Sequence, residues 1–349
     1  ANVATDEDGR VVVVNILDSS DAFRRGLRYG EEIVSFAGRP VTTVNGLKNL
    51  LGIFTKGWRL PLGYRRDVQR ADIHVRLAGV HTPEELIRKT QRNVKPPGPR
   101  PEPDAPRPEP DAPRPEPAPE QPPGPRIPPR SRERRPVERP LPKAVAEHFE
   151  ARRGYANYYF NQRQRDRIWK ALRQVSDFAG DHAVWTLSGQ LDERATLRIM
   201  LDDRQTFARL ATANEDRDLL LDLGDDLSQQ LQPDGSGGLL VALHLWRRLL
   251  TTGPSQYGEA FYLGTAPWSD REDLADVLVA VHDVVETRFY FDTASGLLLG
   301  LEMFPDSEVD PCEIEFRDYR EVNGRRVPFE LKVRHGDCLL YTSDAADDR

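Results

Sequence analysis

The stretch SSDAFRRGLRYGEEIVSFAGRPV, residues 19–41, is the most informative about the fold of this 349-residue chain. The apolar run VVVVNIL (residues 11–17) precedes it and predicts a strand. Small residues then predict a turn and a brief helix ending at Gly-Leu, and GRPV (38–41) predicts a second turn. Beyond the stretch, TTVNGLKNLLGIF (42–54) predicts a helix, and WRLPLGYRR and ADIHVRLAGV predict a closing pair of strands.

In this order, the segments resemble a PDZ domain of the bacterial HtrA/Deg type. SSDAFRRGL stands where that family usually has GSPA-x-x-A-G-L, and YGEEIVSFAGRPV stands where it has a Gly-Asp-x-Ile strand and a Gly-x-x-Val turn. Two departures are Ser20-Asp21 in place of Pro-Ala, and Glu31 where Asp is common. The resemblance implies a PDZ-like β-sandwich capped by helices, over residues 1–92.

PDZ domains bind extended peptides by adding them as a strand, and a loop of backbone N–H groups holds the terminal carboxylate. That loop normally precedes the first strand, so only part of it is expected at Val3 and Ala4. The resemblance also implies a groove helix over residues 43–54. Its apolar candidates for peptide contact are Val44, Leu47, Leu50 and Leu51. Each of them is equally well explained as part of the domain's own core.

A proline-rich segment divides the chain. Residues 96–142 hold 20 of the 29 prolines, and PRPEPDA occurs twice in tandem. Because proline fixes φ and removes an N–H donor, we expect a disordered, extended linker over residues 93–142. At roughly 3.1 Å per residue, such a linker is long enough to separate its flanking domains by on the order of 100 Å.

The segment after the linker, residues 143–337, predicts an α+β domain with an antiparallel sheet. A helical stretch (144–175) is followed by WTLSGQL, ATLRIML, TFARLAT and DLLLDLG at strand-like spacing, and then by the apolar helix GLLVALHLWRRLL (238–250). Asn323-Gly324 predicts a hairpin turn. In the strand after it, Val327, Phe329, Leu331 and Val333 are expected to form the dry face.

This second domain resembles the curved half-barrels of periplasmic lipoprotein carriers (LolA-like proteins), on FRDYREVNGRRVP (316–328) and the rhythm of its strands. Such half-barrels hold acyl chains in an apolar concavity. The candidates for its lining are Phe289, Phe291, Leu299, Leu301, Ile314 and Phe316. We favour the alternative that these side chains form an ordinary core against residues 240–250.

Charge and composition restrict the partners. The net charge of −7 and the pI near 5.6 argue against binding to nucleic acid or anionic lipid by bulk charge. No run of 18 apolar residues occurs, and no signal peptide is visible, although the first residue is not Met. The closing CLLYTSDAADDR looks like the translation of a transposase sequencing adapter, so residues 338–349 are expected to be an adapter-derived tail.

Several motifs have a functional and a structural interpretation. DGSGG (234–238) is close to the GDSGG of trypsin-like nucleophiles, but a turn and a helix start explain it better. His244 is expected in the core, and His282-Asp283 at a strand end. The acidic run 306–310 is expected to be a hairpin loop rather than a calcium site. Arginine-rich residues 126–139 and the Tyr- and Trp-containing segment 152–169 are expected to be a linker end and a packing helix rather than a nucleic-acid surface.

The resemblances lead to one preferred function and one alternative. We expect the non-catalytic C-terminal portion of an HtrA/Deg-like serine endopeptidase in the cell envelope or periplasm, with the catalytic residues on a domain upstream of Ala1. Its partners would be peptide or protein C-termini, and no catalytic residue, cofactor or metal is expected in this chain. The alternative is a non-enzymatic envelope scaffold that binds a lipid or lipoprotein in the second domain.

Overall fold

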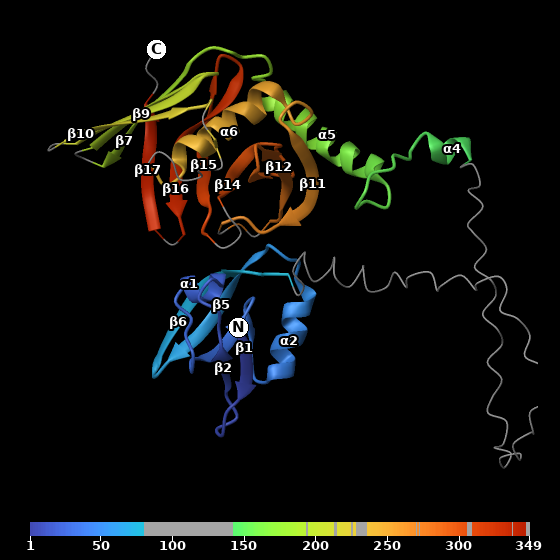
Figure 1. Cartoon of the computed structure of the whole chain (residues 1–349), viewed down its shortest axis with the longest axis vertical. Helices are drawn as coiled ribbons and strands as arrows, with labels where there is room; N and C mark the ends of the chain where they lie inside the picture. Colours follow the sequence, from blue (N-terminus) through green and yellow to red (C-terminus); the bar gives the residue numbers. More distant parts are fainter. Residues whose placement is uncertain are drawn as a thin grey trace, which may run out of the picture. The chain divides into compact units, whose positions relative to one another are not determined.

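The strands and helices predicted for the first part of the chain form in the predicted order (Figure 1). They make a small antiparallel sheet with the strand order β1-β2-β3-β5-β6, in which β4 pairs with β3. The elements of this N-terminal module (residues 1–78) are β1 (Asn2–Thr5), β2 (Val11–Asn15), α1 (Asp21–Arg24), β3 (Glu32–Phe36), β4 (Arg39–Pro40), α2 (Val44–Ile53), β5 (Arg59–Arg66) and β6 (Gln69–Arg76).

The computed structural model describes residues 1–79, 142–192, 195–212, 215–224, 226–227, 236–269, 271, 273–305, 309–336 and 338–346. Residues 1–78 and 149–349 together form one compact unit, and residues 79–148 form a second. The second unit contributes the short helix α4 (Lys143–Ala146) to the described residues. The predicted linker, apart from Pro142, lies outside them, as do the arginine-rich residues 126–139 and Asp306, Ser307 and Glu308 of the acidic run.

Both helices of the N-terminal module begin where a hydroxyl side chain caps them. Ser20 accepts a hydrogen bond from the Phe23 N–H at 3.4 Å, and Thr43 accepts one from the Gly46 N–H at 3.0 Å. Each cap satisfies a backbone donor that has no partner within the helix, which is typically worth about 1 kcal/mol. Ser20 and Thr43 therefore determine where α1 and α2 start.

The C-terminal domain is an eleven-stranded antiparallel sheet with two helices. The strand order is β10-β9-β8-β7-β17-β16-β15-β14-β13-β12-β11. Its elements are α5 (Tyr158–Val175), β7 (Trp185–Asp192), β8 (Ala195–Leu201), β9 (Gln205–Thr212), β10 (Asp216–Asp222), α6 (Leu239–Thr252), β11 (Glu259–Ala266), β12 (Ala275–His282), β13 (Val285–Phe291), β14 (Leu298–Phe304), β15 (Cys312–Val322), β16 (Arg325–His335) and β17 (Cys338–Ala346). The chain is thus mostly antiparallel β-sheet with few helices, and both sheets are open.

The single helical stretch expected over residues 144–175 is wrong, because residues between α4 and α5 are not helical. Gly154 in this gap has φ of +90°, a conformation outside the helical region. Asn157 then caps α5, since its side chain accepts a hydrogen bond from the Tyr159 N–H at 3.1 Å. The packing helix predicted here is confirmed for α5, in which Tyr158, Ile168 and Leu172 are buried.

Helix α6 fills the inner side of the curved sheet (Figure 1). Twelve of its fourteen residues are buried, as expected for a helix that is apolar on nearly all sides. Five of the six predicted lining residues pack in the same core as α6, so the favoured interpretation as an ordinary core is confirmed for Phe289, Phe291, Leu301, Ile314 and Phe316. Leu299 lies on the other face of the sheet, with Trp58, Trp268 and Tyr290.

The alternation predicted for β16 is only half correct. Leu331 and Val333 face the core, but Pro328 is more buried than Val327 or Phe329. The change of face begins at Asp318 in β15, whose φ of +48° lies outside the extended region, although the register stays continuous, with Arg317 opposite Glu330 and Tyr319 opposite Pro328. In a strand that is extended throughout, period-two alternation would direct Asp318 to the core after Ile314 and Phe316, whereas Tyr319 packs there instead.

A search of the described helices for membrane spans finds none with the length and apolar character to cross a bilayer.

Gly300 in β14 provides a test of the packing on the outer face of the sheet. A Cβ atom there would lie 2.1 Å from Cζ2 of Trp268 and 2.5 Å from the Ile314 carbonyl oxygen. We predict that Gly300→Ala lowers the free energy of unfolding by about 1–3 kcal/mol, because the large indole or the backbone must move. Denaturant unfolding measures the change.

The matched control is Gly52→Ala in α2, where an added Cβ would meet no atom within 4 Å. Replacing a helical glycine by alanine should raise stability by roughly 0.5–1 kcal/mol. Equal effects of the two substitutions would contradict the close contact at Gly300.

Candidate functional site

Strand β1 is an open edge of the N-terminal sheet. It pairs with β2 on one side, with Val3 opposite Val13 and Ala4 opposite Val12, and it ends the strand order. Among the described residues, no strand pairs with its other side. Helix α2 contacts β1. An open strand edge of this kind presents backbone donors and acceptors to which a further strand can bind.

The predicted peptide-contact residues differ in accessibility. Leu47 is 3% exposed and belongs to the module's own core, which is the alternative that the sequence left open. Val3, Val44 and Leu50 are half-buried and pack against that core, and Ala4 is half-buried in β1. Leu51 is 39% exposed. Of this set, Leu51 has the most surface available for a ligand.

Sequence reasoning missed one exposed apolar side chain in α2. Ile53 is 63% exposed, at the C-terminal end of the helix. Val44 and Leu51 are seven residues apart and therefore lie on one side of α2. The exposed apolar surface of α2 thus includes Ile53 in addition to the predicted positions.

A second cluster of functional groups lies on the outer face of the C-terminal sheet. Glu302 in β14 and Glu313 in β15 are register partners, and they are only 1% and 6% exposed. Arg76 pairs with Glu302, and Arg59 Nη1 lies 2.7 Å from Glu313 Oε1. The Tyr290 hydroxyl also donates to Glu302 at 2.6 Å. Both buried carboxylates are therefore neutralised by arginines of the N-terminal module.

The surroundings of these two carboxylates affect their ionisation differently. Burial alone would raise the pKa of Glu302, but Arg76 outweighs it and holds that pKa below its usual range. Burial raises the pKa of Glu313, despite the nearby Arg59 guanidinium. Glu302 is thus the more firmly ionised member of the pair.

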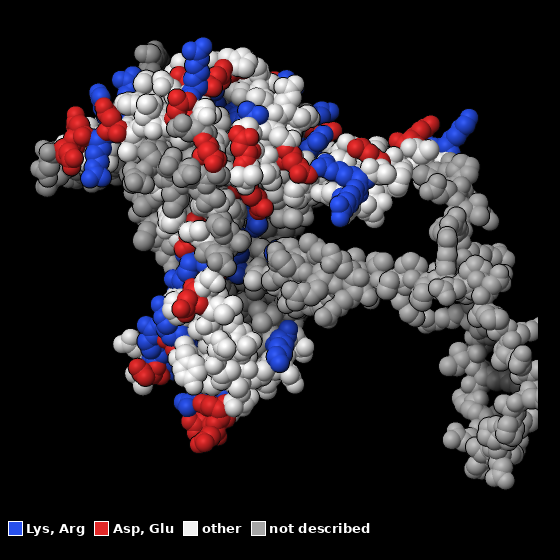
Figure 2. Space-filling view, viewed as in Figure 1, with Lys and Arg blue, Asp and Glu red and all other residues white. Residues whose placement is uncertain are grey.

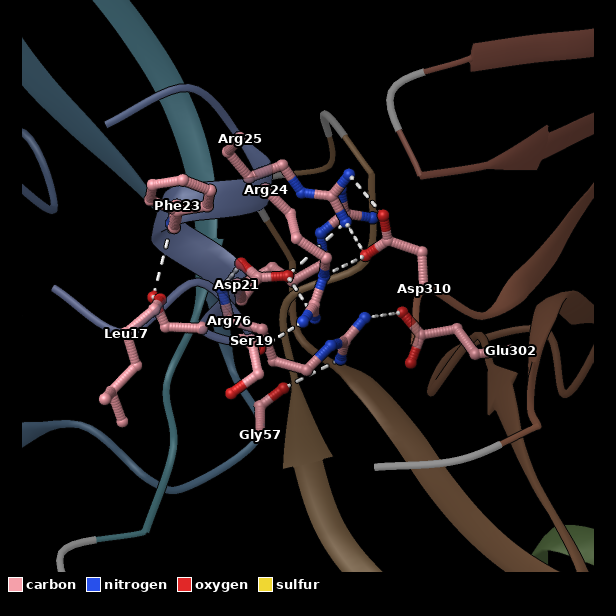
Figure 3. Close-up of polar contacts among 12 residues, drawn as sticks. Leu17, Ser19, Asp21, Phe23, Arg24, Arg25, Gly57, Arg76, Glu302 and Asp310 are labelled. Carbon is pink, nitrogen blue, oxygen red and sulfur yellow. Dashed lines mark hydrogen bonds and ion pairs between the residues drawn. The ribbon is translucent and has the colours of Figure 1, made fainter. Parts of the chain in front are cut away.

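Further contacts join the same two parts of the compact unit. Arg24, the last residue of α1, lies 3.2 Å from Oδ1 of Asp310, and Arg25, which follows the helix, lies 2.9 Å from the same atom (Figure 3). The Trp58 indole N–H donates to the Thr265 carbonyl oxygen at 3.1 Å. The local sequence contains no pattern that would have predicted these partners, because they are more than 200 residues apart.

A cavity of about 280 Å³ opens beside these ion pairs. It is lined by both charged and aromatic side chains, among them Trp268, Tyr290, Lys332 and Arg334. Elsewhere the charges are mixed: Figure 2 shows Lys and Arg interspersed with Asp and Glu over the face in view.

The remaining sequence motifs are placed as structural features. Ser236 is buried just before α6, and its Oγ accepts a hydrogen bond from the Gly238 N–H at 3.2 Å, so the predicted helix start is confirmed. His282 ends β12 and Asp283 follows in the turn, as predicted. Among the described residues, no group of three or more His, Cys, Asp or Glu side chains is arranged to hold a metal ion.

Comparison with known proteins does not assign this chain to a family. No family model matches the chain, and no curated protein matches it. A solved structure that matches is a LolA superfamily protein from Nitrosomonas europaea, with 8% sequence identity and a TM-score of 0.30, covering 52% of this chain and 91% of that one. A likeness at this level carries no argument, and the comparisons give no evidence for a PDZ domain.

Removing one partner of the buried ion pair between Arg76 and Glu302 should strongly destabilise the fold. Arg76→Met leaves Glu302 buried beside Glu313 without its main counter-charge, so we predict a loss of about 3–5 kcal/mol in the free energy of unfolding. The double variant Arg76→Met with Glu302→Gln removes the unpaired charge and should recover much of this loss. If the effects of the two substitutions on the free energy of unfolding, measured by denaturant unfolding, are additive in a double-mutant cycle, Arg76 and Glu302 do not interact and the prediction is wrong.

The buried His244 predicts a dependence of stability on pH. Burial and the nearby His282 lower the pKa of His244 to about 3, against 6.5 for an ordinary histidine. The unfolded chain therefore binds a proton that the folded chain does not between these values, and stability falls as pH falls from 6.5 toward 3. For His244→Leu, the slope of unfolding free energy against pH should be smaller by up to ~1.4 kcal/mol per pH unit in this window. Identical slopes for the two proteins would exclude a buried neutral His244.

Proposed function

We propose that the N-terminal module binds an extended peptide or a protein C-terminus, which adds as a strand along the open edge of β1. The observation that carries this proposal is an edge strand with no partner on one side among the described residues, next to a helix that presents exposed apolar side chains. Together with the resemblance of residues 19–41, it supports a PDZ domain of the HtrA/Deg type.

In this proposal the backbone of β1 supplies the affinity, because each added ladder bond pairs a donor with an acceptor whatever the ligand sequence. Val44 and Leu51 on α2 supply the selectivity, since alternate side chains of a strand point to the same side. Leu47 has no direct part, because it is buried in the core.

The wider role follows from the same resemblance. The chain is then the non-catalytic recognition part of an HtrA/Deg-like serine endopeptidase of the cell envelope, whose catalytic residues lie on another domain. Lipid binding in the second domain is the weaker candidate, because α6 packs against the apolar inner face of the sheet.

The test is peptide binding to the full chain, measured by fluorescence anisotropy with labelled peptides that end in valine. Leu51→Glu places a charge where we expect an apolar ligand side chain, and it should weaken binding about tenfold or more. Val68→Glu is the control, because Val68 is 91% exposed in the turn between β5 and β6, at the other end of the sheet from β1.

Amidation of the peptide C-terminus separates two binding modes. A strong loss on amidation indicates that the carboxylate is held, whereas unchanged binding indicates strand addition alone. Equal affinity of the Leu51→Glu and Val68→Glu variants would contradict the proposal.

A further inference from the structure

We propose that the cavity beside the buried ion pairs binds a small monocarboxylate, held by Lys332 and Arg334. This inference is independent of peptide binding at β1. It rests on the balance of donors and acceptors around the cavity, on an unpartnered buried donor in its wall, and on its size.

Lys332 and Arg334 lie two residues apart on β16 and line the cavity from one face of the strand. Their register partners on β15 are Glu315 and Glu313, so two cross-strand ion pairs would be the ordinary outcome. The structure pairs both glutamates elsewhere instead. Arg59 bonds both carboxylate oxygens of Glu313 at 2.7 Å, and Arg317 bonds Glu315 at 2.8 Å.

The other carboxylates of the cavity wall also have ion-pair partners. Arg76 pairs with Glu302, and Arg70 pairs with Asp72 at 3.0 Å. Each of the four acidic residues that line the cavity therefore has an arginine partner. In the described part of the chain, the side chains of Lys332 and Arg334 make no hydrogen bond or ion pair with another residue. Two cations without an acceptor thus face one cavity.

Trp268 provides the second observation. It is 6% exposed, lines the cavity, and its indole N–H has no acceptor among the described residues. A buried donor without an acceptor typically costs about 1–3 kcal/mol, which an oxygen atom of a ligand would recover. Trp268 also stacks on Tyr290 with ring centroids 4.2 Å apart, which makes one wall of the cavity aromatic.

These features define the class of ligand. The two cations and the indole N–H require an oxyanion, and the aromatic wall favours an apolar body attached to it. A single negative charge fits better than a double one, because the lining carries four acidic and four basic side chains and so has no formal net charge to balance a dianion. The volume of about 280 Å³ lies at the lower end of the range of small-molecule pockets, roughly 300–1,000 Å³, which suits a small molecule.

The experiment is isothermal titration of the full chain with two probes, benzoate and inorganic phosphate. Benzoate should bind, and more tightly than phosphate. The variant Lys332→Met with Arg334→Met should bind benzoate at least tenfold more weakly. The control Arg326→Met removes an exposed arginine of the same strand and should leave binding unchanged.

Because Lys332 and Arg334 make no ion pair with any residue that the structure describes, their removal should not lower the thermal unfolding midpoint in the absence of benzoate. If the double variant nevertheless fails to fold, the single variants Lys332→Gln and Arg334→Gln should each weaken benzoate binding. The proposal is overturned if benzoate does not bind at millimolar concentration, if phosphate binds more tightly, or if Arg326→Met weakens binding as much as the double variant.

Discussion

Two glutamates buried opposite each other, Glu302 and Glu313, are the constraint on which the arrangement of this compact unit depends. Like charges directly opposite in a sheet repel, and a buried charge without a partner is costly. Arg76 and Arg59 remove both penalties, and both come from strands of the N-terminal module. The outer face of β14 and β15 therefore requires the N-terminal module in order to be electrostatically satisfied.

The same pairing has a consequence for the neighbouring strand. Arg59 pairs with Glu313. Without Arg59, Glu313 would be free to pair with Arg334, which lies opposite it on β16. A contact that joins distant parts of the chain thereby leaves a cation unpaired in the cavity. The stability of the unit and the charge of its cavity are thus two results of one set of ion pairs, which also includes Arg25 and Asp310 (Figure 3).

The inner and outer faces of the large sheet are stabilised differently. The inner face packs apolar side chains against α6 over a single core, while the outer face combines the ion pairs with the stacked Trp268 and Tyr290. Gly300 allows that stacking, because a side chain at this position would occupy the space of the indole ring. Polar chemistry is therefore concentrated on the outer face, where a ligand has access.

Local sequence was sufficient for most of the elements. Apolar runs and turn residues predicted most strands and both helices of the N-terminal module, the apolar helix α6 and the hairpin at Asn323-Gly324, where both residues have positive φ. These features depend on neighbours a few residues apart. The break before α5 and the change of face at Asp318 were missed, because each depends on a single residue leaving the regular conformation.

The candidate sites divide in the same way. The sequence by itself predicted an apolar helix over residues 43–54 and named Leu51 among the candidates for contact, but it placed Val3 and Ala4 in a loop, whereas they lie in strand β1. Only the tertiary structure decided that Leu47 is buried, that Leu299 faces outward, and that Lys332 and Arg334 lack the partners opposite them. The physical reason is that burial and charge pairing are set by residues that are distant in the chain and close only in the fold.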